Sequence, residues 1–258
     1  MLTVVILAAG HGSRLRSSLP KPLTPIGPKS CLDHLICTAR TLNPEAIIVV
    51  HSAEQESLYR SVLDADIILA KQPQIDGTAS ALQAGLASIN HDGQVLVLMG
   101  DTPLVQADDL VQLIEVTSPS SLGLITCHVM DPTGYGRIIR QTNGAISSIV
   151  EQKMLNPEQS SIREINSGIF CMPLAWTRTA LEDCKSNPIT GERYLTDLVA
   201  MAHHSGSSIM SHAVLPETVQ GINTPRDRCS VERTYQKQIA ELWIANGVTI
   251  IDPNRFDV

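Results

Sequence analysis

The 258-residue chain has no apolar run near the roughly 20 residues that a membrane-spanning helix needs. It also lacks a charged leader followed by an apolar stretch, so we expect no signal peptide and a cytoplasmic location. Positive charge is scarce: 19 lysines and arginines stand against 26 acidic residues, for a net charge of −7. This balance argues against a general binder of nucleic acids or membrane surfaces.

Reactive pairings are missing as well. The six cysteines are scattered and form no C-x-x-C pair, so they are expected to be reduced thiols in the core. The histidines have no zinc-site spacing, and no Ser/His/Asp or Cys/His arrangement is evident. These absences argue against redox, zinc and nucleophilic-triad chemistry.

The chain does have a short apolar, β-branched run followed by a glycine-containing loop. Residues 2–7 read Leu-Thr-Val-Val-Ile-Leu, residues 8–15 read Ala-Ala-Gly-His-Gly-Ser-Arg-Leu, and Pro-Lys-Pro-Leu follows at 20–23. Gly10 and Gly12 allow the backbone close to an anion. Arg14 and Lys21 supply positive charge for phosphate groups. The pattern favours a polyphosphate-binding loop.

Two common phosphate loops do not fit this pattern. The third glycine of the dinucleotide fingerprint is replaced by Leu15, and no acidic residue ends the next apolar run at 46–51. No Gly-Lys-Ser/Thr triplet follows, which excludes the P-loop. A third kind of phosphate loop remains.

The order of apolar segments predicts an α/β fold. Continuous apolar runs at 3–8, 46–51, 66–70 and 94–99 are typical of buried parallel strands, and helical patterns at 32–42, 54–63 and 78–89 separate them. Strands and helices then follow in a denser order, with strands at 122–129, 136–140, 145–150, 164–172 and 207–214 and helices at 107–116, 174–184, 194–204 and 225–245. We expect a Rossmann-like mixed, mostly parallel sheet flanked by helices.

Several polar side chains follow the predicted strands of the first half. Asp101 comes just after the strand at 94–99, where its carboxylate suits Mg²⁺, although a turn or cap would also explain it. Gln72 offers an amide that matches a pyrimidine edge, and Gly77 would let the backbone approach a base. The alternative is an ordinary loop that ends in a helix cap at Thr78 or a neighbouring residue.

The second half carries another group of candidates. Gly136 belongs to a glycine- and tyrosine-containing loop at 131–138, and Glu151 ends a strand. Asn166 places an amide in an otherwise apolar strand, where either sugar hydroxyls or a structural hydrogen bond would satisfy it. Asn223 either caps the helix that follows or supplies a second metal ligand; Thr224 is the expected N-cap.

Taken in order, these segments resemble one family. The first loop and Pro-Lys-x-Leu are similar to the signature of sugar-1-phosphate nucleotidylyltransferases. More specific are Asp-Pro-Thr-Gly-Tyr-Gly-Arg-Ile (131–138), Ile-Val-Glu-x-Lys (149–153), Glu-Ile-Asn-x-Gly-Ile (164–169) and Asp-Pro-x-Arg-Phe-Asp (252–257). Over residues 4–256 the chain resembles the uridylyltransferase domain of bacterial bifunctional N-acetylglucosamine-1-phosphate uridylyltransferase/glucosamine-1-phosphate acetyltransferases.

The resemblance implies a nucleotide-diphospho-sugar transferase fold with Mg²⁺ as cofactor. UTP and N-acetylglucosamine 1-phosphate would give UDP-N-acetylglucosamine, a precursor of peptidoglycan and lipopolysaccharide. The implied roles are catalysis by Arg14 and Lys21; nucleotide binding by Leu7, Ala8, Ala9, Gly10, Gly12, Ser13, Gln72, Gly77 and Thr78; sugar binding by Gly136, Glu151 and Asn166; and metal binding by Asp101 and Asn223.

The implied layout is a nucleotidyltransferase domain at 1–228, with a nucleotide half at about 1–105 and a sugar-acceptor half at about 106–228. A C-terminal helix and the start of a linker follow at 229–258. The hexapeptide repeats of the family's acetyltransferase β-helix do not occur in these residues. Because that β-helix forms most of the family's trimer, the resemblance leaves the oligomeric state of this chain open, with a homo-oligomer among the alternatives.

Some positions depart from the family pattern. Ile75, Asp76, Ala79 and Ser80 stand where the family has Gln, Leu, Gly and His, and Met99 replaces a common Tyr. Two alternatives therefore stay open: a related transferase with another sugar or nucleotide, and a non-catalytic nucleotide-sugar-binding protein.

Overall fold

The computed structural model describes residues 1–10, 12–15, 17 and 19–257. Within them the strands are β1 (Leu2–Leu7), β2 (Pro25–Ile26), β3 (Lys29–Ser30), β4 (Ala46–His51), β5 (Ile68–Lys71), β6 (Gln94–Met99), β7 (Ser121–His128), β8 (Arg137–Arg140), β9 (Ile146–Val150), β10 (Glu164–Pro173) and β11 (Ser208–Val214). The helices are α1 (Cys31–Thr41), α2 (Glu56–Val62), α3 (Thr78–Leu86), α4 (Ala107–Val116), α5 (Leu174–Asp183), α6 (Asp197–His204) and α7 (Pro225–Ala245).

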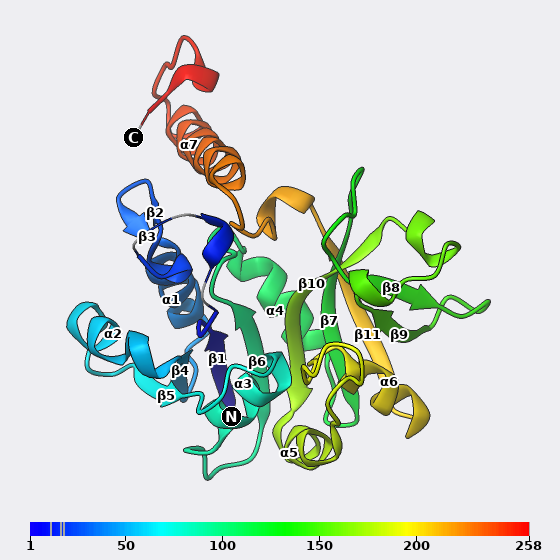
Figure 1. Ribbon diagram of the computed structural model, residues 1–258. Coiled ribbons are helices and arrows are strands. Elements are labelled where there is room, and N and C mark those ends of the chain that lie inside the picture. Colours follow the sequence, from blue (N-terminus) through cyan, green and yellow to red (C-terminus); the bar gives the residue numbers. More distant parts are fainter. Residues whose placement is uncertain (11, 16, 18, 258) are drawn as a thin grey trace.

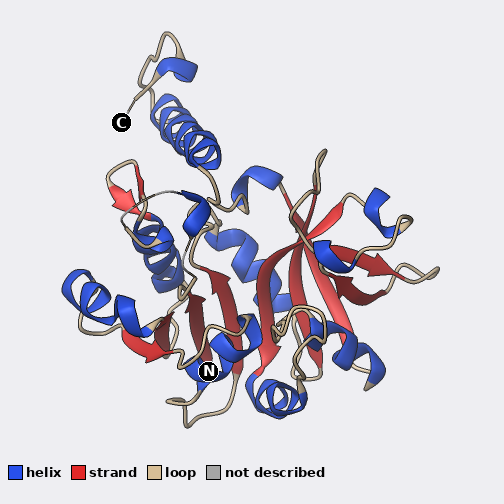
Figure 2. Cartoon of the chain, in the orientation of Figure 1, coloured by secondary structure: helices blue, strands red, loops and turns tan. Residues whose placement is uncertain are grey.

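Nine of these strands form one mixed sheet that runs through the molecule (Figures 1 and 2). The order is β11-β7-β10-β6-β1-β4-β5, and the hairpin of β8 and β9 joins through β10. Strand β1 lies parallel to both β4 and β6, whereas β10 runs antiparallel to β6 and β7. The predicted mixed α/β sheet is confirmed.

The strand order places a ligand crevice beside β1. The chain runs from β1 through α1 to β4 and β5, and then returns to β6 on the other side of β1. Open α/β sheets bind ligands at such a reversal, outside the carboxyl ends of the strands. Here those ends are Leu7 and Met99, which are direct neighbours in the register.

Both faces of the sheet are covered by helices. Val5 and Leu7 point into a core that includes side chains of α3, α5 and α6, while Val4 and Ile6 face α1, α2 and α4. Burial on both faces explains why β1, β4 and β6 read as unbroken apolar runs. Figure 1 shows α7 extending away from the sheet toward the C-terminus.

Most element boundaries agree with the predicted ones to within two residues. Two helix ends differ from the prediction by three residues: α3 ends at Leu86 instead of 89, and α6 begins at Asp197 instead of 194. The second error has a tertiary cause, because the backbone N–H of Leu195 donates to Thr78 Oγ1 at 2.9 Å. No helix in the described part of the chain has the length and apolarity to cross a membrane.

Candidate functional site

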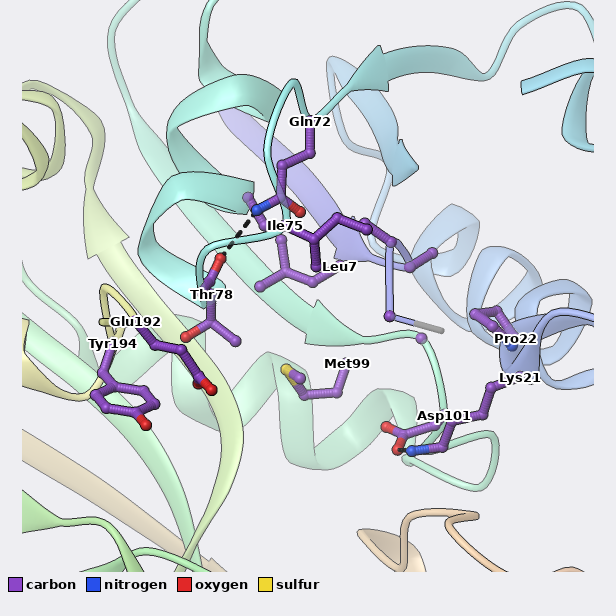
Figure 3. A pocket seen from close by; sticks show the side chains of 16 residues that line it. Leu7, Lys21, Pro22, Gln72, Ile75, Thr78, Met99, Asp101, Glu192 and Tyr194 are labelled. Carbon is purple, nitrogen blue, oxygen red and sulfur yellow. Dashed lines mark hydrogen bonds and ion pairs between the residues drawn. The ribbon is translucent and has the colours of Figure 1, made fainter. Parts of the chain in front are cut away.

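Two adjoining cavities open along the crevice, with volumes of about 310 and 260 Å³. The larger, here called the nucleotide cavity, lies against the ends of β1 and β6. The smaller, the acceptor cavity, lies against β8, β9 and β10. Thr78, Met99, Asp101 and Tyr194 line both cavities. The two spaces therefore share a wall and form one continuous cleft. Figure 3 shows Asp101 beside Lys21 in the nucleotide cavity.

The nucleotide cavity collects most of the residues that the sequence predicts for this role: Leu7, Ala8, Ala9, Gly10, Lys21, Gln72, Gly77 and Thr78. Gly12 and Arg14 do not line it, and the side chain of Ser13 lies outside the described part of the chain. A Cβ at Gly10 would meet nothing within 4 Å, so the backbone there faces open space. That openness suits close approach of a ligand to the loop.

A small polar cluster stands at the cavity junction. Lys21 Nζ donates to Asp101 Oδ2 and, at 2.9 Å, to Asn223 Oδ1. Arg14 Nη2 donates to the same Asn223 oxygen at 3.1 Å. The four residues come from widely separated parts of the sequence, and the fold brings together all the predicted catalytic and metal-binding side chains.

The loop geometry explains how Lys21 reaches this position. Gly12 adopts φ = +59°, and a Cβ there would lie 2.8 Å from Lys21 Cβ. A glycine at this position therefore allows the two segments of the first loop to pack together. Lys21 also begins a short 3-10 turn, Lys21–Leu23, which follows Pro20.

The start of α7 fixes Asn223. Thr224 caps the helix as predicted, and its hydroxyl accepts a hydrogen bond from the Asp227 N–H. Asp227 in turn accepts from the backbone N–H groups of Asn223 and Thr224 at 2.9 and 2.8 Å. Asn223 is thus not the cap, and its amide is free to face Lys21 and Arg14.

The donor set suits a hard divalent cation. One carboxylate oxygen and one amide oxygen converge on the Lys21 ammonium, so both lie within reach of a single positive centre. Gly221 leaves room beside them, because a Cβ there would lie 3.2 Å from Asp101 Oδ2. The described residues contain no cluster of three His, Cys, Asp or Glu side chains, so phosphate oxygens and water would complete the coordination of such an ion.

The Gln72 amide, predicted from the sequence to face a base, is partly used within its own loop. Gln72 Nε2 donates to the Gly77 carbonyl at 3.1 Å, so part of the amide closes its own loop. Gly77 adopts φ = +128°, and its missing Cβ would lie 2.2 Å from the Arg193 carbonyl oxygen. Close packing against the Arg193 backbone therefore requires a glycine at position 77, independently of any ligand.

The acceptor cavity brings together the three predicted sugar-binding residues, Gly136, Glu151 and Asn166. Glu151 Oε1 accepts a hydrogen bond from Thr196 Oγ1 at 2.8 Å. Burial is the largest influence on Glu151 and raises the pKa of its carboxyl, while the Thr196 hydrogen bond opposes that shift. This carboxylate is a strong acceptor for hydroxyl groups.

A bulge in β10 shapes the same cavity. The register between β10 and β7 shifts between Asn166 and Phe170. Ser167 Oγ donates to the Ile125 carbonyl at 2.8 Å, so a hydrogen bond within the protein already satisfies this hydroxyl donor. Gly168, at φ = +83°, lets Met99 pack against the bulge, since a Cβ would lie 2.6 Å from Met99 Cγ.

One segment that lines both cavities, residues 187–196, was not predicted from the sequence as part of the site. Glu192 and Tyr194 line the nucleotide cavity, and Thr196 lines the acceptor cavity. Figure 3 shows Glu192 and Tyr194 on the wall opposite Lys21. The turn-forming residues Asn187, Pro188 and Gly191 could have indicated a loop here, but no local signal shows what the loop faces.

This fold and cleft define an α/β nucleotide-binding protein with a basic group at one cavity and an acceptor space beside it. Residues 4–205 match the family described as MobA-like NTP transferase domain. The chain belongs to that family and is an enzyme of the nucleotidyltransferase class.

Proteins named Bifunctional protein GlmU match over the whole length of this chain. The chain is 39% identical to the one from Herminiimonas arsenicoxydans over 260 residues. This alignment covers 100% of the present chain and 57% of that protein. It is 42% identical to those of Acinetobacter baumannii (strain AYE), with 99% and 56% covered, and Pseudomonas aeruginosa (strain LESB58), with 100% and 57% covered. The chain therefore spans somewhat more than half the length of these relatives.

Proposed function

We propose that the protein transfers UMP from UTP to N-acetylglucosamine 1-phosphate, giving UDP-N-acetylglucosamine and pyrophosphate. One observation carries the proposal: Lys21, Asp101 and Asn223 converge where the two cavities meet. A nucleotide in one cavity and a sugar phosphate in the other would bring their phosphates to this point. The motifs of the acceptor half support the choice of sugar.

The reaction needs positioning and charge neutralisation more than proton transfer. The phosphate oxygen of the sugar phosphate, ionised at neutral pH, attacks the α-phosphorus in line while pyrophosphate leaves. Lys21 and Arg14 neutralise charge on the phosphates. Asp101 and Asn223 would hold Mg²⁺, which when bound withdraws charge from the phosphate oxygens. Glu151 and Asn166 would orient the sugar.

A matrix of substrates tests this proposal. Purified protein is incubated with each of UTP, dTTP, CTP, ATP and GTP, paired with the 1-phosphates of N-acetylglucosamine, glucosamine, glucose and galactose, and pyrophosphate release is measured. The largest kcat/KM is expected for UTP with N-acetylglucosamine 1-phosphate. A larger value for another pair would reassign the substrates. Tight binding of UDP-sugar without pyrophosphate release from any pair would indicate a non-catalytic binding protein.

A further inference from the structure

The segment at 187–196 forms walls of both cavities. It lies between α5 and α6 and belongs to no strand of the described sheet. Its position depends on contacts with the nucleotide half. The Arg193 N–H donates to the Asp76 carbonyl at 2.7 Å, and the Arg193 carbonyl accepts from the Ala79 N–H at 3.0 Å. The backbone of Arg193 is thereby joined to the start of α3.

The Arg193 side chain extends this connection to two helices. Its Nη1 donates to Gln83 Oε1 on α3 at 2.7 Å. Its Nε donates to the Cys184 carbonyl at 2.9 Å, and Nη2 donates to the Leu181 carbonyl. These two carbonyls lie at the C-terminal end of α5, where helical carbonyls lack intrahelical partners and a cation is favoured.

We infer that Arg193 is a positioning residue for the transfer reaction. Its guanidinium joins α3 to the end of α5 and thereby fixes the position of residues 187–196 relative to α3. Glu192 and Tyr194, on either side of it, are thereby held on the cavity wall. Arg193 lines neither cavity and does not contact Lys21 or Asp101. The inference rests on the proposed function only for the identity of the two substrates.

Replacing Arg193 should therefore affect binding more than chemistry. In Arg193→Ala, the KM for both UTP and N-acetylglucosamine 1-phosphate should rise roughly tenfold, the effect of losing one hydrogen bond to a charged group. The kcat at saturation should stay within about twofold, because the groups at the cavity junction are untouched. Gln83→Ala, which removes only the α3 side of the contact, should give a smaller rise. Arg60→Ala is the matched control, since that arginine is exposed, pairs with Glu56 on α2 and lines neither cavity.

A second readout is independent of turnover. Amide hydrogen exchange should speed up at residues 187–196 in Arg193→Ala and stay unchanged in α7, and the Kd for UTP measured by calorimetry should weaken in parallel with KM. Unchanged KM and exchange, or a fall in kcat with KM unchanged, would overturn the inference. If the wild-type protein turns over no substrate pair, the proposed function fails, and the Kd of the nucleotide that it binds still decides the role of Arg193.

Discussion

Lys21 is the residue on which the cleft is centred. Its ammonium contacts the Asp101 carboxylate and the Asn223 amide oxygen, and the Lys21 and Asp101 side chains are only 15% and 17% exposed. Each charge offsets the other in a site partly withdrawn from water. Under the proposed function, the phosphates of a bound nucleotide would attract the same ammonium and compete with the Asp101 carboxylate for it.

Removing either charge should impair turnover while leaving the fold intact. We expect Asp101→Asn and Lys21→Ala each to lower kcat by roughly 10²–10³, the usual effect of removing one electrostatic group in a transition state. Circular dichroism should match that of the wild type. Arg60→Ala, which loses only an exposed ion pair with Glu56, is the control and should retain activity. Near-normal turnover in either of the first two variants would remove that residue from the mechanism.

Glu151 links stability to pH. Burial raises the pKa of its carboxyl above the ordinary 4.5, so the folded protein holds this proton more tightly than the unfolded chain does. The cost of ionising the buried group is absent below pH 4.5 and grows as the pH rises through the folded pKa. Above the folded pKa the cost no longer changes with pH.

The variant Glu151→Gln should therefore melt at a higher temperature than the wild type at pH 7. This advantage should shrink as the pH falls toward 4.5, because the wild-type carboxyl becomes neutral as well. The same variant should raise the KM for the sugar phosphate, since a carboxylate accepts hydroxyl hydrogen bonds more strongly than an amide. Melting temperatures across a pH series measure the first effect, and a difference that does not vary with pH would contradict it.

At the scale of single residues, the sequence predicts which residues line the cleft better than it predicts their contacts. Lys21 and Asp101 could be assigned because each follows the end of a buried strand or loop at the same edge of the sheet. The contacts of Gly77 with Arg193 and of Thr78 with Leu195 could not be predicted, because each pair is more than a hundred residues apart in the sequence.

At the scale of elements, the junction between α3 and the segment 187–196 joins the two halves of the cleft. Gly77 precedes α3 with φ = +128° and ψ = 174°, a conformation restricted almost to glycine. The Arg193 backbone packs where a side chain would begin. Any side chain at residue 77 would therefore meet both backbone strain and a steric clash with Arg193.

Gly77→Ala should destabilise the protein by about 1–3 kcal/mol from backbone strain alone, with a further loss from the clash with Arg193. Gly191→Ala, in the segment that contacts residue 77, is a matched control, because Gly191 also has positive φ, +74°, but a Cβ there meets nothing within 4 Å. Urea unfolding should show the larger loss for Gly77→Ala. Equal losses in the two variants would mean that the contact with Arg193 contributes nothing.

Element boundaries were predictable where local pattern and tertiary packing agree. β4, β6, α4 and α7 begin and end where the sequence predicts. The predicted start of α6 was wrong because the Leu195 N–H bonds to Thr78 at the start of α3, a tertiary contact that outweighs local helical preference. The bulge in β10 was also missed, since the alternation of apolar residues there does not reveal a register shift.

At the scale of the whole molecule, a single sheet carries both cavities. The parallel strands β6, β1, β4 and β5 position residues 7–10 at the nucleotide cavity. The antiparallel β10 and its attached hairpin position Glu151 and Asn166 at the acceptor cavity. The parallel part follows from the alternation of strands and helices in the sequence. The insertion of β10 between β6 and β7 does not, because pairing between strands distant in sequence leaves no local pattern.

The central claim is that one cleft transfers a nucleotidyl group between two phosphates. The most direct test is to incubate the protein and Mg²⁺ with N-acetylglucosamine 1-phosphate and UTP labelled in the α-phosphate. The label should appear in UDP-N-acetylglucosamine in amounts equal to the unlabelled pyrophosphate released, and Asp101→Asn should lose both products together. Release of label as UMP, or pyrophosphate without labelled UDP-sugar, would contradict the account.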